Sequence, residues 1–350
     1  MPPGNPGRKE KTMTDSNAYK VVVFKFSPQM KAVWGDPLYI EREILEGAGA
    51  TIVETDIGSE EEFIEAAHDA DALLIHGGPR KISRKIMDSL KKCKIIALPT
   101  VGFDNIDVAA AAENNIWVTN TPDVFIEEVA DHTMTLLLSC WRRLITQDQL
   151  VRTGRWMEAR PMLNQYPRLT GMTLGFVAFG NIPRAVCRRA KAFGLNMLAY
   201  DPYRSELDMI GYGVEPVSRL SELLNRSDFV SAHLPSSFET DRMLSEETFK
   251  QMKSTGIFLN TGRGATVDEA ALIKALQEGW IAYAGLDVFE TEPVDSDNPL
   301  LKMDNVILTA HAASASARMP VDARRRAARE IVNMLRGGQP LSPVNRIGAA

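Results

Sequence analysis

The stretch TLGFVAFGNIPRAVCRRAKAFGLNMLAYD, residues 173–201, decides the fold of this chain. An apolar run (173–179) ends at a turn with Gly180, a helical stretch follows, and a second apolar run (196–201) ends in Asp201. This order is typical of a βαβ unit whose helix N-terminus binds the pyrophosphate of a dinucleotide. A carboxylate after the second strand accepts hydrogen bonds from the ribose hydroxyls and repels a 2′-phosphate, which favours NAD over NADP.

The turn departs from the G-x-G-x-x-G pattern, because Ala178, Gly180 and Pro183 occupy the three glycine positions. Proline is tolerated in the first helical turn, where its missing N–H has no partner within the helix. By itself the broken motif fits a plain structural turn equally well. The position of Asp201 and the motifs downstream favour the dinucleotide site. Arg204 is interpreted as a solvated loop charge, with a weakened preference for NAD as the alternative.

Apolar runs alternate with helical patterns on both sides of this stretch. Segment 40–49 has helical spacing, and 59–70 begins with a serine cap and an acidic first turn. Repeated βα units imply parallel sheets with helices on both faces. The strongly apolar segment 122–144 is predicted as one long helix. The predicted strands are 20–26, 50–56, 71–76, 94–100 and 116–120, then 173–179, 196–201, 229–234, 256–261, 283–289 and 305–310.

Length and composition favour a two-domain globular protein without a nucleic-acid or membrane partner. The chain has 350 residues and a formal net charge of −5, whereas nucleic-acid binding normally needs a basic face. Cys93, Cys140 and Cys187 form no CxxC pair, which suits a reducing cytoplasm and predicts no metal site. Residues 1–19 lack an apolar core and are interpreted as a disordered extension, not a secretory signal. No stretch reaches the roughly 18 apolar residues of a membrane span.

Several long motifs make the chain resemble the D-isomer-specific 2-hydroxyacid dehydrogenases, which include phosphoglycerate dehydrogenases and glyoxylate/hydroxypyruvate reductases. The resemblance covers about residues 20–345. VADH, YDPY and HAA are similar to the branch that includes the C-terminal-binding corepressors and their bacterial enzyme relatives. The markers are VGFDNID (101–107), EEVADHTMTLLL (127–138), TLGFVAFGNIPRAV (173–186), YDPY (200–203), AHLP (232–235), LNTGRGATVDEAALIKAL (259–276), AGLDVFETEP (284–293) and LTAHAAS (308–314).

The resemblance implies a fold of the α/β class, with two Rossmann-like, doubly wound parallel-sheet domains and an intervening cleft. The substrate domain would be discontinuous, formed by residues 20–118 and 313–350, and the NAD-binding domain would span 119–312. The helix near 122–144 would form much of a homodimer contact. The implied activity is interconversion of a 2-oxo acid and a D-2-hydroxy acid by hydride transfer at C2, with NAD as cofactor.

Three residues match the family's catalytic pattern. Arg263 matches the arginine that binds the substrate carboxylate and polarises the C2 carbonyl, a task suited to a planar, permanently charged guanidinium. His311 matches the general acid/base, and Glu292 matches the carboxylate that orients the ring and favours its protonated form. Taken alone, an arginine in a turn is usually a solvated charge, and a histidine after a strand is usually structural.

The same match implies further contacts. Asp287 resembles the acid that holds the nicotinamide amide, and His132, on an apolar helix, is interpreted as a buried, satisfied side chain. The implied cofactor-binding residues are Gly180, Asn181, Ile182, Asp201, His233, Pro235, Thr261 and Asp287. The implied substrate-binding residues are His76, Gly77, Gly78, Val101, Gly102 and Arg263, with the glycines suited to close approach of backbone to ligand.

Two departures from the family pattern bear on function. His76 stands where phosphoglycerate dehydrogenases carry an arginine, which argues against a phosphorylated substrate, although Arg80 lies nearby in sequence. Asn181 replaces a commonly basic residue, and together with Pro183 this predicts weaker or differently posed NAD binding. The alternative function is an NAD(H)-responsive, corepressor-like scaffold with little turnover. A formate-type dehydrogenase is disfavoured, because that chemistry is associated with a glutamine in place of Glu292. The motifs leave the natural substrate open.

Overall fold

A computed structural model describes residues 19–24, 37–55, 58–76 and 81–347. The predicted extension, apart from Tyr19, and the predicted substrate contacts Gly77 and Gly78 lie outside the described residues, as does Arg80. The chain divides into two units by its internal contacts. Unit 1 contains Met1–Val124 and Ala317–Ala350, and unit 2 contains Phe125–Ser316. Among the described residues, no helix has the length and apolarity needed to cross a bilayer.

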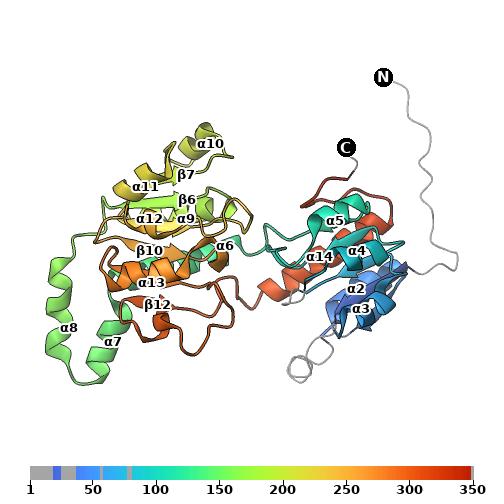
Figure 1. The fold of residues 1–350 in the computed structure, drawn as a ribbon, viewed down its shortest axis with the longest axis horizontal. Coiled ribbons are helices and arrows are strands. Elements are labelled where there is room, and N and C mark those ends of the chain that lie inside the picture. The colour runs from blue at the N-terminus through green and yellow to red at the C-terminus, as the bar shows by residue number, and fades with distance from the viewer. Residues whose placement is uncertain (1–18, 25–36, 56–57, 77–80, 348–350) are drawn as a thin grey trace. The chain divides into compact units, whose positions relative to one another are not determined.

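Unit 1, in which Figure 1 labels α2 to α5 and α14, is built on a parallel sheet in the order β2-β1-β3-β4-β5. Its strands are β1 (Tyr19–Phe24), β2 (Ala50–Thr55), β3 (Ala72–Leu74), β4 (Ile95–Ala97) and β5 (Trp117–Thr119). Its helices are α2 (Tyr39–Leu45), α3 (Glu60–Ala67), α4 (Arg84–Ser89), α5 (Val108–Glu113) and α14 (Met319–Leu335), with the 3₁₀ turn η1 (Glu46–Ala48). The inner strands are continuous apolar runs because helices cover both faces of the sheet.

The C-terminal segment of the chain completes unit 1. Ala327 and Ile331 of α14 pack in one apolar cluster with Val21 and Ile95 of the sheet. Farther on, the Asn345 side chain accepts a hydrogen bond from the backbone N–H of Val118 and donates one to the carbonyl of Ile116. These contacts attach residues from both ends of the sequence to one sheet.

Unit 2 is built on a larger parallel sheet in the order β12-β11-β10-β9-β6-β7-β8. Its strands are β6 (Thr173–Val177), β7 (Asn196–Tyr200), β8 (Glu215–Pro216), β9 (Phe229–Ala232), β10 (Ile257–Asn260), β11 (Tyr283–Leu286) and β12 (Val306–Leu308). Its helices are α6 (Ile126–Trp141), α7 (Leu144–Arg152), α8 (Trp156–Met162), α9 (Asn181–Ala192), α10 (Glu206–Gly211), α11 (Leu220–Arg226), α12 (Glu246–Phe249) and α13 (Glu269–Gln277). Its 3₁₀ turns are η2 (Leu163–Gln165), η3 (Gly264–Thr266) and η4 (Pro299–Lys302). The predicted α/β class with two parallel sheets is confirmed.

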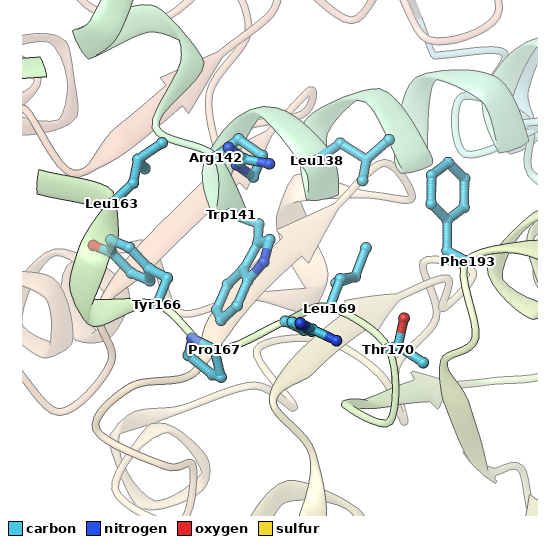
Figure 2. A pocket seen from close by; sticks show the side chains of 10 residues that line it. Leu138, Trp141, Arg142, Leu163, Tyr166, Pro167, Leu169, Thr170 and Phe193 are labelled. Atoms are coloured by element: carbon cyan, nitrogen blue, oxygen red, sulfur yellow. The ribbon is translucent and has the colours of Figure 1, made fainter. Parts of the chain in front are cut away.

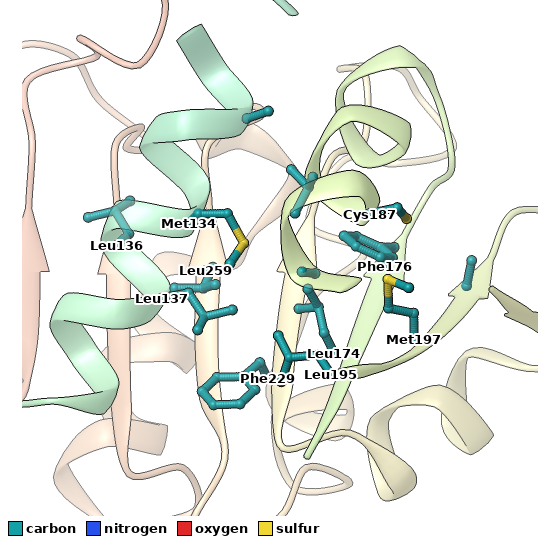
Figure 3. Packing of buried hydrophobic residues seen from close by; sticks show 14 of the residues in the cluster. Met134, Leu136, Leu137, Leu174, Phe176, Cys187, Leu195, Met197, Phe229 and Leu259 are labelled. Carbon is teal, nitrogen blue, oxygen red and sulfur yellow. The ribbon is translucent and has the colours of Figure 1, made fainter. Parts of the chain in front are cut away.

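The core of unit 2 joins α6 to the centre of the sheet. Met134 and Leu137 of α6 lie in one buried cluster with Phe176 of β6, Phe229 of β9 and Leu259 of β10 (Figure 3). The long apolar segment predicted as one helix is divided, since α6 ends at Trp141 and Arg143 takes a left-handed backbone conformation with φ 52° before α7. Its apolar character reflects burial against the sheet.

Ala178, at the end of β6, has φ 74°, in the left-handed region that favours glycine. We expect Ala178→Gly to raise the free energy of unfolding of unit 2 by about 1 kcal/mol, because an L side chain is strained by about that amount there. Urea denaturation checks this result. Ala192→Gly, at the exposed last residue of α9, is the matched control and should lose up to about 0.5 kcal/mol. A loss of stability in both variants would contradict the prediction.

Candidate active site

The predicted functional residues of unit 2 lie at one edge of its sheet. Gly180 and Asp201 follow β6 and β7, and His233 follows β9. Arg263 follows β10, and Glu292 and His311 lie in the loops after β11 and β12. All these strands run parallel, so their carboxyl ends meet at the same edge, which is where open α/β sheets bind ligands.

Glu292 and His311 are in direct contact. His311 Nδ1 lies 2.7 Å from Glu292 Oε2, and because a carboxylate only accepts, Nδ1 carries the hydrogen. The other carboxylate oxygen, Glu292 Oε1, accepts a 3.0 Å hydrogen bond from the backbone N–H of Phe289. Half of the His311 side chain is exposed, so its second nitrogen, Nε2, is available for proton exchange with a ligand.

The loop that carries His311 is tied to β11 by Asp287, which is fully buried. The backbone N–H of His311 donates to the carbonyl of Asp287 at 2.8 Å. The Asp287 carboxylate accepts hydrogen bonds from the backbone N–H groups of Ala312 and Ala313, both at 2.9 Å. His311 itself has φ 49°. These three bonds hold the loop in a conformation that an L residue rarely adopts.

The turn that carries Arg263 is shaped by Asn260, a buried residue that sequence reasoning missed. The Asn260 side chain accepts from the N–H of Gly262 and donates to the carbonyl of Arg263, each at 3.0 Å. The Arg263 guanidinium donates to the Gly262 carbonyl at 2.9 Å. A Cβ on Gly264 would lie 1.8 Å from the carbonyl oxygen of Phe289, so glycine is required where this turn meets the loop after β11. The polar end of an otherwise apolar strand was the available signal for Asn260.

The turn after β6 fits the pyrophosphate of a dinucleotide. Gly180 is the N-cap of α9, and a Cβ built on it meets no described atom within 4 Å. Pro183 is buried in the first turn of the helix, a position that tolerates proline. The Asp201 carboxylate accepts hydrogen bonds from the N–H groups of Phe179 and Tyr203, both at 2.8 Å. The turn, the helix N-terminus and the acid after β7 are therefore held together.

We expect Gly180→Ala to fold with unchanged stability and to bind NADH at least about 10-fold more weakly. The added methyl meets no protein atom, but it occupies the face from which a phosphate would approach the helix amides. Fluorescence titration and thermal unfolding measure the two quantities. Gly175→Ala is the matched control, because a Cβ on Gly175 would lie 2.2 Å from Ser227 Oγ. This variant should unfold at a lower temperature than wild type. Equal NADH affinity in Gly180→Ala and wild type would contradict the prediction.

Other predicted cofactor contacts occupy the middle of the same edge. His233 Nε2 lies 2.8 Å from Ser231 Oγ, while its Nδ1 is buried and makes no hydrogen bond to the described residues. Burial lowers the pKa of His233 to about 3. The hydroxyl of Thr261 lies 3.0 Å from that of Thr133 on α6, and the carbonyl of Pro235 accepts from a threonine hydroxyl. The exposed Asn181 and half-buried Ile182 open the first turn of α9.

The described substrate-side candidates of unit 1 also follow neighbouring strands. His76 comes after β3, and Val101 and Gly102 come after β4. Sequence reasoning missed the group beneath His76, a buried ion pair of Glu41 and Arg324, with Glu41 Oε1 3.4 Å from His76 Nε2. Burial and the charge of Arg324 lower the pKa of His76 to about 3. This imidazole is therefore neutral at neutral pH.

The low pKa values predict an acid-sensitive fold. An unfolded imidazole gains a proton near pH 6.5, whereas folded His233 stays neutral down to about 3. Between these values the unfolded state binds more protons, so stability falls as pH falls below 6.5, by about 2 kcal/mol at pH 5. In urea denaturation, wild type should lose about 2 kcal/mol of unfolding free energy between pH 7.5 and pH 5 through His233. His233→Gln should not show this loss. His68→Gln, at an exposed position, is the control and should leave the pH dependence of stability as in wild type. If His233→Gln also shows the wild-type pH dependence, the prediction is contradicted.

A separate cavity of about 490 Å³ lies beside the end of α6 (Figure 2). Trp141 and Leu138 of α6, Tyr166 and Leu169 of the following segment, and Phe193 line it. None of the predicted catalytic, cofactor-binding or substrate-binding residues is among its lining residues. The predicted site is thus distinct from this cavity.

Comparisons with known proteins agree with this geometry. The family model described as D-isomer specific 2-hydroxyacid dehydrogenase, NAD binding domain, matches residues 134–313. Glyoxylate reductase from Korarchaeum cryptofilum is 45% identical over 290 residues, 82% of this chain and 86% of that protein. D-3-phosphoglycerate dehydrogenase from Methanocaldococcus jannaschii is 38% identical over 90% of this chain and 59% of that protein. The crystal structure of an NADPH-dependent glyoxylate/hydroxypyruvate reductase from Sinorhizobium meliloti, in complex with NADP and malonate, has a TM-score of 0.77 and 31% identity, covering 94% of this chain and 97% of that one.

These relatives are enzymes, and they give the corepressor-like alternative no support. The identity to the Korarchaeum enzyme extends over most of both chains, and the matched family model covers the nucleotide turn and the loops of Arg263, Glu292 and His311. The predictions of a nicotinamide cofactor and of 2-hydroxyacid chemistry are confirmed. The chain belongs to the D-isomer-specific 2-hydroxyacid dehydrogenase family and is a nicotinamide-dependent oxidoreductase that interconverts 2-oxo acids and D-2-hydroxy acids.

Proposed function

We propose that the substrate is a small, unphosphorylated 2-oxo acid such as glyoxylate or hydroxypyruvate. The glyoxylate reductase from Korarchaeum, similar along most of the chain, supports this choice. His76 supports it as well, because burial and Arg324 lower its pKa to about 3 and leave no positive charge there for a phosphate. A neutral imidazole at this position suits a short carboxylic acid.

The proposed mechanism depends on the 2.7 Å contact between His311 and Glu292, the observation that carries the assignment. Arg263 binds the substrate carboxylate with its planar fork and polarises the C2 carbonyl. When bound, a reduced nicotinamide would supply the hydride that C2 accepts. His311 donates its Nε2 proton to the carbonyl oxygen, which becomes the hydroxyl, and returns to neutral imidazole. Glu292 accepts the Nδ1–H and so orients the ring for this transfer. In the reverse direction His311 removes the hydroxyl proton.

We propose NAD rather than NADP as the preferred cofactor. The Asp201 carboxylate at the end of β7 is fixed by two backbone N–H groups and repels a 2′-phosphate. Gly180, Asn181 and Ile182 would receive the pyrophosphate, and His233, Pro235, Thr261 and Asp287 would lie on the nicotinamide side. The Sinorhizobium relative uses NADPH, so the preference needs a direct test.

We propose different binding roles for the two units. Unit 2 would bind the dinucleotide, and the substrate-side candidates of unit 1 are those expected from the sequence, Val101 and Gly102 with Gly77 and Gly78. The domain boundaries expected from the sequence, 118/119 and 312/313, stay a prediction. The division by internal contacts falls at 124/125 and 316/317.

We propose that the chain is a cytoplasmic homodimer. Unit 2 carries exposed apolar side chains on α7 and α8, and such clusters mark interfaces. They are Leu144, Ile145, Val151, Trp156 and Met157. Light scattering after gel filtration should give a dimer for wild type and a monomer for a Trp156→Glu, Met157→Glu variant, while Leu207→Glu on α10 stays dimeric.

All three cysteines are buried and free, which suits a reducing compartment such as the proposed cytoplasm.

Steady-state assays with NADH and with NADPH test the proposed activity. The panel contains glyoxylate, hydroxypyruvate, pyruvate and 3-phosphohydroxypyruvate, with chiral analysis of the products. We expect turnover of the two small acids with NADH, a D product from hydroxypyruvate, and little turnover of the phosphorylated acid. A preference for the phosphorylated acid would overturn the substrate class, and a preference for NADPH would overturn the role of Asp201.

A further inference from the structure

A chain of hydrogen bonds runs from helix α6 to the loop that carries His311. Thr309 Oγ1 lies 2.6 Å from Asp287 Oδ1 and 2.9 Å from His132 Nε2. The single hydroxyl hydrogen of Thr309 goes to the carboxylate, which only accepts and is the closer partner. The hydroxyl oxygen therefore accepts from His132, whose Nε2 carries a hydrogen. His132, interpreted from sequence as a satisfied side chain, thus donates to the active-site loop.

Asp287 is the centre of this network. Its side chain is buried, and its two oxygens accept from the hydroxyl of Thr309 and from the N–H groups of Ala312 and Ala313. Among the described residues, the basic group within ion-pair distance of this carboxylate is His132, with Nε2 3.5 Å from Oδ1. A buried carboxylate is costly unless donors surround it, so its position depends on every donor that it has.

The same network holds the strained conformation of His311. The N–H groups of His311, Ala312 and Ala313 all bond to Asp287, through its carbonyl and its carboxylate. A φ of 49° costs energy at a residue with a side chain, and it persists only where surrounding contacts enforce it. If Asp287 shifts, the loop relaxes, and His311 Nδ1 moves away from Glu292.

We propose that His132 is a positioning residue that fixes Thr309 and Asp287, and through them the orientation of His311 toward Glu292 and the substrate. This proposal rests on the proposed role of His311 as acid/base. In this proposal α6 both packs in the core of unit 2 and positions the loop of His311. His132 contacts the loop through the Thr309 hydroxyl, so its effect on His311 is indirect.

The test uses four single variants of the chain and one double variant, His132→Leu with Thr309→Val. His132→Leu and Thr309→Val each break the chain of hydrogen bonds. His132→Gln keeps an amide N–H near the position of Nε2. Thr135→Val is the matched control for Thr309→Val, because Thr135 lies on α6 and its hydroxyl donates to the helix carbonyl of Asp131.

We expect His132→Leu and Thr309→Val to lower kcat about 10- to 100-fold, as a small misplacement of a reacting group does. The double variant should be no worse than either single one, because both remove the same chain of contacts. His132→Gln should recover most of the activity. Equal losses in His132→Leu and His132→Gln, or additive losses in the double variant, would overturn the proposal.

A second measurement separates this proposal from the proposed function. In proton NMR of the free protein, the Nδ1–H of His311 against Glu292 should give a low-field resonance, assigned by its loss in His311→Asn. That resonance should disappear or shift in His132→Leu and Thr309→Val, and persist in His132→Gln and Thr135→Val. If it persists in all four, His132 does not position His311. If wild type turns over no 2-oxo acid while the resonance responds as expected, the proposed function fails and the positioning stands.

Discussion

His311→Asn lowers kcat for 2-oxo acid reduction by about 10²- to 10⁴-fold, the usual contribution of a general acid. Asparagine tolerates the left-handed conformation of this position, and its side-chain amide still offers an N–H to Glu292. The fold and the contact with Glu292 are therefore preserved, while the proton on Nε2 is lost. Steady-state kinetics with NADH measure the loss, and fluorescence titration should give an unchanged affinity for NADH.

Glu292→Gln is the companion variant. A glutamine oxygen still accepts from His311 Nδ1–H but is a weaker acceptor than a carboxylate, so we expect a smaller loss of about 10- to 100-fold in kcat. Exposed Glu290, in the same loop, is replaced by glutamine as a control and should leave kcat unchanged. His311→Asn with kcat within about 3-fold of wild type would remove His311 from the mechanism.

Arg324→Leu destabilises unit 1 by about 3–5 kcal/mol, because it leaves the buried Glu41 carboxylate without its cation. Arg324 Nε donates to Glu41 Oε1 at 2.7 Å, and Nη2 donates to Glu41 Oε2 and to the carbonyl of Pro37. Hydrogen exchange followed by mass spectrometry measures the change separately in peptides of each unit. Faster exchange is expected in β1 to β5, and unchanged exchange in β6 to β12.

Two further variants identify the cause of that loss. Replacing both Glu41 and Arg324 by leucine should recover most of the stability, since no buried charge is then left unpaired. Arg152→Ala breaks an exposed ion pair with Asp148 and should cost no more than about 0.5 kcal/mol. Because Glu41 lies beside His76, Arg324→Leu should also raise the KM for the 2-oxo acid without changing NADH affinity. A double-leucine variant as unstable as Arg324→Leu would mean that packing, not charge, dominates.

The strands of both sheets were largely predictable because their residues form short apolar runs. Each run predicted after the turn at Gly180 contains an observed strand, namely β7, β9, β10, β11 or β12. The observed strand β8 had no predicted run. β8 comprises Glu215 and Pro216, partly exposed residues at the edge of the sheet, and has no apolar run to identify it. Strand ends differ, because apolar residues continue into buried loops, as at Leu98 after β4.

By itself the sequence determined the βα order, the glycine turn before α9 and the placement of Arg263, Glu292 and His311 directly after successive strands. These properties depend on residues close together in the chain, such as local hydrophobic pattern and turn chemistry. Only the tertiary structure decided which polar groups meet. Glu41 and Arg324 are 283 residues apart, and His132 reaches Thr309 across 177 residues. Glu41, His132 and Arg324 each look like an ordinary helix residue in the sequence, and the partner of each is set by how the helices pack against the sheets.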